Sequence, residues 1–540
     1  MGELAAHWVA QQPDQVAVTH GARCWTWSEL AERVASASAA LRLLGLRPGD
    51  RVAVLTGNHP ATLELTLACA RLGTVCVPVN PRLPAEEIEY LVNDSTATLL
   101  VIGPESADAD APADSTDSPG SAGQSRFPAV RHVIRVGGTD GGTDPGTDPG
   151  TRGCSNGRTS GGPADGYEAW LESGRAAAPG EHSADPDACF LQLYTSGTTG
   201  RPKGVLLTHR GVLGVCAGVQ PISGGRPDHS WLVTMPLSHI GGQECALAAL
   251  CMGARVVLAR DGEPDVAGLI ERERITHTFL PAATLAALSA DAGATTRDFG
   301  AVRQVWFGGC TIPRSTLRDC MSLFPDALVH AYGMTEVCGV ATVLGTGERL
   351  DHRHRLSSVG RPIAGVELQV RDPNTGAPLP SGRPGEVWVR TAHLMAGYWR
   401  DPEATEAAIT EGGWYRTGDG GLLDAHGYLY LTDRIQDRII SGGRYVYPSE
   451  VERILAELPS VAELAVIGVP DESWGEVPKA LVVAAEGHTV DEAALLAHCR
   501  RYLAKEKCPR SVDVVDHLPR NATGRITKKD LYPRYWPHPD

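Results

Sequence analysis

The first hundred residues alternate between two patterns of hydrophobic positions. Apolar side chains recur every three or four residues, as on one face of a helix, or form short continuous runs, as in a buried strand. Thr26-x-x-Glu29 is a capping-box sequence, and it opens a helix whose apolar positions include Leu30 and Leu41. The other predicted helices are 59–72 and 84–93, and the predicted strands are 50–55, 74–79 and 98–102. This βαβ order predicts a parallel sheet covered by helices.

Residues 104–187 interrupt the alternation. They are rich in Pro, Gly, Ser, Asp and Thr, and residues 138–150 read GTDGGTDPGTDPG. Such a composition buries too little apolar surface to offset the entropy lost when the chain becomes ordered. Only residues 131–136 have a strand pattern. We predict a largely flexible surface insertion, and a docking loop is the alternative.

The alternation resumes after Ser230. Turns and short strands then follow Gly360, and a smaller α+β unit begins near residue 437. The predicted strands are 231–235, 254–258, 277–280, 302–307 and 328–332 in the second array, and 461–468 and 480–484 in the C-terminal unit, whose helix covers 491–503. The predicted fold class is α/β, with two βα sheet subdomains and a small antiparallel β unit before a small α+β C-terminal domain.

Composition excludes several classes of protein. Among the 540 residues, 64 are acidic and 49 basic, giving a net charge of −15, which disfavours binding to nucleic acid or to an anionic membrane surface. The most apolar run, residues 63–79, contains Glu64 and Arg71, so no membrane span is expected. The N-terminus lacks the pattern of a secretory signal. The 13 cysteines include no Cys-x-x-Cys pair, which indicates reduced thiols. We therefore expect a cytoplasmic, multidomain enzyme.

The strongest motif is YTSGTTGRPKGV at residues 194–205. Its glycines let backbone amides turn toward an anion, its hydroxyls add donors, and Lys203 adds a compact positive charge. A Gly/Thr-rich surface turn is the alternative. Gly204 follows Lys203 where a Walker A loop has Ser or Thr to hold magnesium. The loop therefore suits a polyphosphate but is not a Walker A loop.

Four later segments follow this loop. They read YGMTE at 332–336, WYRTGD at 414–419, DRIQDRIISGGRYVYPSEVE at 433–452 and LPRNATGRI at 518–526. Together with the loop they resemble the motifs of the adenylate-forming superfamily, which comprises acyl-CoA synthetases, luciferases and peptide-synthetase adenylation domains. The resemblance covers nearly the whole chain. It implies an N-terminal adenylate- and acyl-binding domain, 1–435, and a mobile C-terminal cap, 436–540.

In the family, a carboxylate attacks the α-phosphate of ATP, pyrophosphate leaves, and a thiol then attacks the acyl-adenylate. The resemblance therefore implies CoA as co-substrate, ATP or acyl-AMP, and Mg²⁺ if adenylation occurs. The implied nucleotide-binding residues are Thr195, Ser196, Gly197, Thr198, Thr199, Gly200, Lys203, Gly309, Cys310, Tyr332, Gly333, Met334, Thr335, Asp419 and Arg434. The implied catalytic residues are His239, Thr335, Glu336 and Arg525.

The resemblance assigns a role to each group. Tyr332 stacks on adenine against the backbone near Gly309, Thr335 donates to the α-phosphate, and Asp419 accepts from the ribose hydroxyls. Glu336 holds Mg²⁺, a hard cation that prefers oxygen ligands. A core tyrosine is the alternative for Tyr332, and outside this set of motifs Glu336 would be interpreted as a solvated carboxylate.

His239, in PLSHIGG at 236–242, matches the family's aromatic gate beside the acyl carboxylate; a structural histidine is the alternative. Amino-acid-activating relatives carry an Asp in this motif, and none occurs between Met235 and Gly242. The expected substrate is therefore a plain carboxylic acid or its adenylate. Glycines at 308, 309 and 333 suggest room for a bulky acid.

The C-terminal motifs imply a thiol site. The stretch ISGGRY resembles that of CoA ligases, and its implied pantetheine tunnel consists of Ser441, Gly442, Gly443 and Arg444. Gln436 occupies the hinge position, where the family commonly has Asp or Lys. We expect no carrier domain in cis.

Arg525 is the main departure from the family, whose final loop reads Gly-Lys. Lysine is a compact point charge, whereas the guanidinium is a wide planar fork, and losing one preorganised charge-stabilising donor costs roughly 10²–10³ in rate. We expect thioester formation to survive and adenylation to be weak or absent, so that a separate enzyme could supply the adenylate. Lys528 or Lys529 could substitute for the missing lysine.

Three alternatives stay open. They are a complete ATP-dependent acid–CoA ligase, in which Arg525 is a tolerated variant, a non-catalytic adenylate-binding module, and an oxygen-dependent luminescent enzyme. On Arg525 alone, the chain also resembles the CoA ligase of platensimycin-type diterpenoid pathways, although no motif establishes the acyl group.

Overall fold

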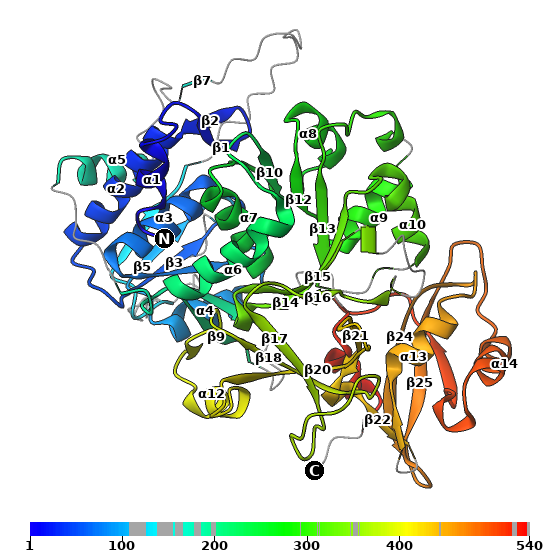
Figure 1. The fold of residues 1–540 in the computed structure, drawn as a ribbon. Helices are drawn as coiled ribbons and strands as arrows, with labels where there is room; N and C mark the ends of the chain where they lie inside the picture. The colour runs from blue at the N-terminus through cyan, green and yellow to red at the C-terminus, as the bar shows by residue number, and fades with distance from the viewer. Residues whose placement is uncertain are drawn as a thin grey trace, which may run out of the picture. The chain divides into compact units, whose positions relative to one another are not determined.

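The computed structural model of the chain contains two compact units (Figure 1). Unit 1 comprises Met1–Asp351, Pro362–Val366 and Thr391–Ala407, and unit 2 comprises His352–Arg361, Glu367–Arg390 and Ala408–Asp540. The described residues are 1–106, 126–137, 155–156, 166–177, 185–195, 201–291, 293–309, 312, 314–345, 347–348, 355, 357–441, 444–520 and 526–536. Unit 2 thus includes the antiparallel segment that precedes the predicted hinge. The predicted boundary at 435/436 concerns a movement and stays a prediction.

The N-terminal βα repeats build one sheet of unit 1, in the order β19-β9-β8-β4-β3-β5-β6. Its strands are β3 (Arg51–Leu55), β4 (Val75–Val79), β5 (Leu99–Ile102), β6 (His132–Arg135), β8 (Cys189–Thr195), β9 (Lys203–Thr208) and β19 (Gly397–Tyr398). Strands β3 to β6 are parallel, and helices α3 (Pro60–Leu72) and α4 (Ala85–Ser95) both pack on β4. These elements confirm the predicted βαβ order.

Local signals at the helix ends are also confirmed. Helix α2 (Trp27–Leu43) begins with the capping box, in which the Thr26 side chain accepts from the Glu29 amide and the Glu29 side chain accepts from the Thr26 amide. Helix α3 ends at Gly73, whose φ of 84° is the left-handed conformation that glycine adopts without strain.

The low-complexity segment is only partly within the described residues. The predicted strand at 131–136 forms β6, which lengthens the sheet beside β5. Residues 166–175, for which no helix was expected, form α5 (Gly166–Arg175), which packs on α2. Tyr167 of α5 is buried, and its hydroxyl donates to Glu64 Oε2 at 2.8 Å. The expectation of flexibility is therefore wrong for α5, because a few apolar side chains and one buried hydrogen bond hold it on the domain.

The second sheet of unit 1 contains the predicted strands of the second array. From β15 its order is β15-β14-β13-β12-β10-β11-β1-β2-β7. These strands are β1 (Val16–His20), β2 (Arg23–Thr26), β7 (Ser155–Asn156), β10 (Ser230–Val233), β11 (Arg255–Leu258), β12 (His277–Phe279), β13 (Gln304–Gly308), β14 (Leu328–Met334) and β15 (Gly339–Leu344). Strands β10 to β14 are parallel, and β15 returns antiparallel to β14. The accompanying helices are α1 (Leu4–Val9), α6 (His209–Ser223), α7 (Ile240–Cys251), α8 (Val266–Arg272), α9 (Ala282–Ala290) and α10 (Arg314–Leu323).

Unit 2 contains an antiparallel sheet and an α+β sheet, as predicted. The first has the order β17-β18-β20-β21, and the second β23-β22-β25-β24, with β26 beside β25. Its strands are β17 (Val366–Arg371), β18 (Gly385–Thr391), β20 (Trp414–Leu423), β21 (Leu429–Arg434), β22 (Ile439–Ser441), β23 (Arg444–Val446), β24 (Val461–Asp471), β25 (Gly475–Ala484) and β26 (Ser511–Val514). Helices α13 (Pro448–Leu455) and α14 (Glu492–Tyr502) lie in unit 2, whereas α12 (Pro402–Ala408) belongs almost entirely to unit 1. The predicted α/β class is confirmed.

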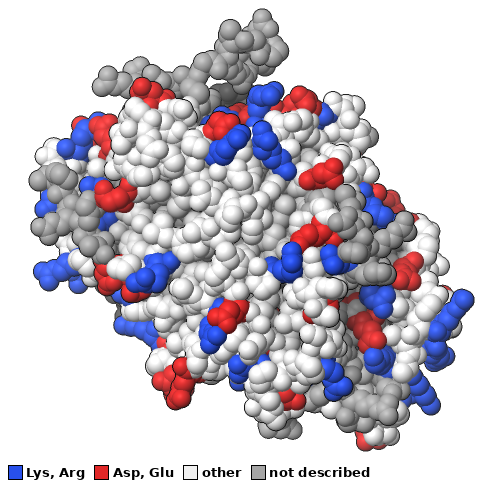
Figure 2. All heavy atoms as spheres, in the orientation of Figure 1, with Lys and Arg blue, Asp and Glu red and all other residues white. Residues whose placement is uncertain are grey.

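Charged side chains of both signs are interspersed over the face shown in Figure 2, around a broad uncharged area. The cysteines of the described part of the chain are free thiols, most of them buried. In that same part, no helix has the length and apolar character that crossing a bilayer requires.

Candidate active site

The predicted phosphate loop connects two antiparallel strands of unit 1. Strand β8 ends at Thr195, β9 begins at Lys203, and these two residues are register partners. The five residues between them that were predicted to bind phosphate, Ser196, Gly197, Thr198, Thr199 and Gly200, lie outside the described residues. The structure therefore brings Thr195 and Lys203 together at the base of the loop.

Lys203 lies in a polar hollow of about 220 Å³. Its Nζ atom is 3.7 Å from Asp401 Oδ2 and 5.1 Å from the ring centre of Tyr398. The hollow is also lined by Tyr90, Asp94, Arg201, Pro202, Gly204, Trp399 and Arg400. The three cations of this hollow exceed its two carboxylates by one positive charge (3 − 2), which suits an anion at the base of a Gly/Thr-rich loop.

The glycines at the carboxyl ends of β13 and β14 are required by strand packing. A Cβ on Gly308 would overlap the carbonyl oxygen of Ala331, and a Cβ on Gly333 would overlap that of Gly339. Gly309, with a φ of 78°, adopts a left-handed conformation, and Cys310 lies outside the described residues. Strand packing explains Gly308 and Gly333, and backbone conformation explains Gly309, so room for a bulky acid stays a prediction.

The predicted adenine and magnesium motif begins in strand β14 and continues into a short 3₁₀ turn, Thr335–Val337. Tyr332 and Thr335 are buried, whereas Glu336 is half-buried. Glu336 Oε1 accepts a hydrogen bond from Tyr398 Oη at 3.0 Å, which orients the carboxylate. Tyr398 also lies beside Lys203, so it connects the two predicted phosphate-site residues. Sequence periodicity gave no sign of this role, because the contact joins residues 62 positions apart.

The donor set at Glu336 fits a magnesium ion that arrives with ATP. Across the part of the chain that the structure describes, no group of three or more His, Cys, Asp or Glu side chains could hold a metal. Mg²⁺ commonly binds one or two carboxylates together with waters and substrate phosphates. Glu336 would supply the carboxylate oxygen, and the bound ion would neutralise charge on the phosphate oxygens.

His239 is the N-cap of α7, and its ring is held in a defined tautomer. Its Nδ1 atom accepts a hydrogen bond from the Gly241 amide at 3.1 Å, which leaves the proton on Nε2. Burial lowers the pKa of His239 to about 4, so the imidazole is neutral near pH 7. Two hydrogen bonds hold the turn before His239. The Leu237 amide donates to Asn58 Oδ1 at 2.9 Å, and Gln243 Nε2 donates to the Leu237 carbonyl oxygen at 2.8 Å. A neutral ring of fixed orientation suits a gate or a hydrogen-bond donor better than a general base.

Unit 2 brings together Asp419, which is predicted to bind the ribose, and Arg434, another predicted nucleotide-binding residue. Asp419 of β20 and Arg434 of β21 are register partners, and Arg434 Nε is 3.2 Å from Asp419 Oδ1. Gly418, with a φ of 69°, makes the turn before Asp419, whose amide donates to Thr417 Oγ1 at 3.0 Å. Asp419 therefore has a fixed position from which its carboxylate can accept from vicinal hydroxyls.

The predicted CoA-tunnel motif forms a β-hairpin. Ser441 ends β22, Arg444 begins β23, and the two are register partners. Gly442 and Gly443, which connect them, lie outside the described residues, as does the Arg444 side chain. The hinge residue Gln436 lies in the 3₁₀ turn Ile435–Asp437, where its side chain is likewise not described.

Of the predicted final catalytic loop, only the two ends lie within the described residues. Arg525 lies outside the described residues, and its neighbour Ile526 forms an antiparallel bridge with Arg520. Lys528, a possible substitute for the family lysine, is half-buried, and its Nζ atom is 2.8 Å from Glu452 Oε1 and 3.7 Å from Asp433 Oδ1. Burial alone would lower the pKa of Lys528, but the two carboxylates raise it above its ordinary value. They also hold the ammonium group in this arrangement.

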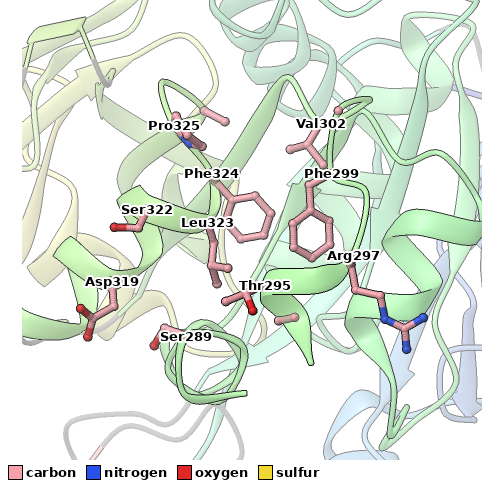
Figure 3. Close-up of a pocket in the computed structure, with 13 residues that line it drawn as sticks. Ser289, Thr295, Arg297, Phe299, Val302, Asp319, Ser322, Leu323, Phe324 and Pro325 are labelled. Carbon is pink, nitrogen blue, oxygen red and sulfur yellow. The ribbon is translucent and has the colours of Figure 1, made fainter. Parts of the chain in front are cut away.

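A larger cavity, of about 680 Å³, lies away from these residues (Figure 3). Phe299 and Phe324 face each other within it, with ring centres 4.9 Å apart. Val302 and Ala327 of its lining precede β13 and β14. The cavity therefore lies at the amino ends of the strands whose carboxyl ends carry the predicted site, so volume alone does not identify that site.

The neutral state of His239 predicts a pH effect on stability. The unfolded chain binds a proton near the ordinary histidine pKa of about 6.5, and the folded chain binds it only near 4, so unfolding becomes easier as pH falls between these values. We expect His239→Phe to shrink the loss of unfolding free energy between about pH 7.5 and pH 5 by about 2 kcal/mol. Urea unfolding at both pH values measures this difference.

The exposed His488 provides the matched control, because His488→Phe removes an imidazole that faces solvent. That variant should keep the wild-type pH dependence. An unchanged pH dependence in His239→Phe would contradict the assignment of a neutral, buried ring.

Comparisons with known proteins agree with this arrangement. The family model of the AMP-binding enzyme matches residues 5–399, and that of the AMP-binding enzyme C-terminal domain matches residues 450–525. A feruloyl-CoA synthase from Amycolatopsis sp is 36% identical over 541 residues, covering 99% of each chain. An indoleacetate–CoA ligase from Aromatoleum aromaticum is 33% identical, covering 96% of this chain and 95% of its own.

A solved structure gives the same result for the fold. ATP-bound MatB from Rhodopseudomonas palustris superimposes with a TM-score of 0.82 at 28% identity, covering 99% of both chains. The comparisons do not confirm the resemblance to a platensimycin-type diterpenoid ligase. The first family model spans well over half of the chain. The chain therefore belongs to the AMP-binding enzyme family, in which it is an adenylate-forming enzyme of the acyl-CoA synthetase type, an acid–thiol ligase.

Proposed function

We propose that the chain forms an acyl-CoA thioester from an acyl-adenylate and CoA, and that its own ATP-dependent adenylation is weak or absent. In the adenylation step a carboxylate oxygen attacks the α-phosphorus, and pyrophosphate leaves. In the thioester step the CoA sulfur attacks the acyl carbon, the bond to the phosphate oxygen breaks, and AMP leaves as the thiol proton passes to solvent. The first step develops charge at the α-phosphate and therefore depends most on a positioned cation.

The observation that supports weak adenylation is that Lys528 forms ion pairs and does not replace the family lysine. Glu452 and Asp433 hold this ammonium group in unit 2, so Arg525 is left as the residue in the position of the family lysine. Lys529 is exposed one residue further along. A guanidinium cannot reproduce the point charge of an ammonium group in a site shaped for it.

The other residues of the site have the roles implied by the family. Thr195, Lys203 and the loop between them would hold phosphates, Tyr332 adenine, and Asp419 with Arg434 the ribose. Thr335 would donate to the α-phosphate, Glu336 would hold Mg²⁺, and His239 would border the acyl carboxylate. Ser441, Gly442, Gly443 and Arg444 would line the thiol path, with CoA as co-substrate. The remaining proposed nucleotide contacts are Gly309, Cys310, Gly333 and Met334.

Contacts across the proposed hinge support a C-terminal movement. Asp433 precedes Gln436, and it accepts from the amide of Ser449 at 2.7 Å as well as facing Lys528. Both partners follow the hinge, so rotation of residues 436–540 about Gln436 would exchange these contacts for others. Such a movement would carry the loop of Arg525 away and admit the thiol.

The relatives favour a second candidate, the complete ligase. Feruloyl-CoA synthase and indoleacetate–CoA ligase are named for the thioester that they form or the acid that they join to CoA. In this alternative Arg525 is tolerated, and the chain converts acid, ATP and CoA into acyl-CoA, AMP and pyrophosphate. A separate adenylating enzyme is then unnecessary.

Replacing Arg525 by Lys separates the two candidates. If the guanidinium limits adenylation, Arg525→Lys should raise the rate of ATP–pyrophosphate exchange about 100-fold, because it restores a compact charge in the family position. The exchange is measured with a panel of carboxylic acids that includes ferulate and indoleacetate. Arg520→Lys, at the other end of the loop, is the matched control and should leave the exchange unchanged. Robust exchange by the wild-type chain, unaltered by Arg525→Lys, would favour the complete ligase.

The bond from Tyr398 to Glu336 gives a second prediction. Tyr398→Phe removes one hydrogen bond to a charged acceptor, so the Mg²⁺ concentration needed for half-maximal ATP binding should rise about tenfold. Calorimetric titration of the chain with ATP at several Mg²⁺ concentrations measures this shift. Tyr430→Phe is the control, because Tyr430 donates to Asp424 at 3.3 Å elsewhere in the chain. Equal Mg²⁺ dependence in the wild type and Tyr398→Phe would exclude this positioning role.

A further inference from the structure

Helix α4 contacts the chain at both ends of the predicted phosphate loop. Tyr90 and Asp94 are four residues apart in α4, so their side chains lie on the same side of the helix. Tyr194 Oη donates a hydrogen bond to Asp94 Oδ2 at 2.6 Å. Tyr90 Oη donates to the carbonyl oxygen of Pro202 at 3.2 Å. Tyr194 lies near the end of β8, and Pro202 directly precedes Lys203, the first residue of β9. One helix is therefore bonded to the chain on each side of the loop.

Trp399, which follows β19, connects α4 to the residue after Lys203. Its Nε1 atom donates to the carbonyl oxygen of Asp94 at 2.9 Å, and its amide donates to that of Gly204 at 2.7 Å. The Arg51 guanidinium lies 3.5 Å from the centre of the Trp399 ring, and this cation–π contact helps to fix the indole. The residues on both sides of Lys203 are thus bonded to α4, directly or through Trp399.

Gly204 shows how little space is left beside these bonds. A Cβ on Gly204 would overlap Gln192 Nε2. Gln192 is buried in β8, and the same Nε2 atom donates to Tyr194 Oη at 3.0 Å. Gly204 and Tyr194 are register partners in the pair of strands β8 and β9. The Gln192 amide therefore fills the space beside Gly204, and its bond leaves the proton of the Tyr194 hydroxyl for Asp94.

The Tyr194 phenol keeps its proton, so it stays a donor to Asp94. Burial raises the pKa of Tyr194, and the neighbouring carboxylate raises it further. A hydrogen bond of 2.6 Å from a hydroxyl to a carboxylate is charge-assisted and stronger than a bond between neutral groups. The rings of Tyr90 and Tyr194 both pack against the core cluster that includes Ile88 and Leu91 of α4. These contacts give the bond between Asp94 and Tyr194 a rigid setting.

Asp94 lines the same hollow as Lys203, but its charge does not suit the predicted ligand. A carboxylate repels a polyphosphate, so Asp94 is not a direct phosphate ligand. The Lys203 ammonium group is carried by a flexible four-carbon stem, and its reach depends on where the backbone is held. The hydrogen bonds of Asp94 with Tyr194 and Trp399 hold that backbone.

We propose that Asp94 and Tyr194 are positioning residues that hold the Lys203 ammonium group where a polyphosphate binds. They act through the pair of strands β8 and β9 and are not themselves phosphate ligands. This inference rests on the proposed function, because it takes Lys203 to bind phosphates. It adds to that site a residue, Asp94, that lies 100 positions before Tyr194 and outside every motif of the sequence.

The test compares ATP with AMP, which lacks the polyphosphate. Calorimetry of the full chain gives the Kd of each nucleotide in the presence of Mg²⁺. Tyr194→Phe keeps the ring and every charge, so the loss of its bond to Asp94 should raise the Kd of ATP about tenfold. The Kd of AMP should stay within about twofold of the wild-type value. An equal Kd of ATP in the wild type and Tyr194→Phe would overturn the proposal.

Substitutions of Asp94 separate its hydrogen bond from its charge. Asp94→Ala should raise the Kd of ATP about fivefold, although removing a negative charge by itself favours an anion. Asp94→Asn keeps an oxygen that accepts from Tyr194 and removes the charge, so its Kd should equal that of the wild type or be lower. Tighter binding by Asp94→Ala as well would contradict the positioning role, because charge alone would then explain both variants.

Lys203→Met tests whether the effect passes through the lysine. In that background Tyr194→Phe should change the Kd of ATP by less than about twofold, because the positioned charge is already gone. The matched control Tyr167→Phe removes another tyrosine–carboxylate bond of unit 1, to Glu64 at 2.8 Å, and should leave the Kd of ATP unchanged. An undiminished effect of Tyr194→Phe without Lys203, or an equal loss in Tyr167→Phe, would indicate a general loss of structure and overturn the proposal. If ATP binding by Lys203→Met is too weak to measure, the Tyr194 and Asp94 variants decide.

A parallel assay keeps this test apart from that of the proposed function. The wild-type chain is incubated with CoA and a panel of synthetic acyl-adenylates, and thioester is quantified. Absence of thioester for every acyl group counts against the proposed function, whereas the comparison of ATP with AMP decides the roles of Asp94 and Tyr194 without turnover. A wild-type chain that does not bind ATP would overturn the positioning role even if thioester forms.

Discussion

The close approach of β14 and β15 is the constraint on which the site depends. The two strands run antiparallel, and Gly333 lies so near the backbone of Gly339 that only glycine fits. This contact fixes the end of β14, so the chain must turn at Thr335–Val337 and present Glu336 beside Tyr398. One packing contact thus positions Glu336, which is predicted to hold Mg²⁺ at the polyphosphate end of the site.

Electrostatics divides the site into two parts. Near the phosphate loop, the cations Arg201, Lys203 and Arg400 and the carboxylates Asp94 and Asp401 line one hollow, and the excess of one positive charge (3 − 2) suits an anionic nucleotide. Near α7, burial lowers the pKa of His239, so its imidazole adds no positive charge there near pH 7. A mixed anhydride of a carboxylic acid and a phosphate has the same asymmetry, with a charged phosphate on one side and an uncharged acyl group on the other.

Sequence patterns predicted the features that depend on residues close together in the sequence. Hydrophobic periodicity predicted strands β3 to β6 and β10 to β14, but it missed β1, β2, β8, β9 and β15. The Thr26–Glu29 box located a helix start, and the motif resemblance assigned both Asp419 and Arg434 to the nucleotide. Contacts between residues far apart in the sequence could not be predicted from these patterns. The Tyr398 hydroxyl donates to Glu336, and Lys528 pairs with Glu452. The glycines at 308 and 333 lie against the backbone of neighbouring strands. Each of these depends on which elements the fold places side by side.

The central claim is that the chain transfers an acyl group from an adenylate to a thiol. Rapid-quench analysis of a single turnover tests it most directly, with the chain in excess over a synthetic acyl-adenylate and with CoA present. The account requires acyl-CoA and AMP to appear together in equal amounts, faster than the adenylate hydrolyses in the absence of CoA. Persistence of the adenylate, or release of free acid without thioester for every acyl group tried, would contradict it.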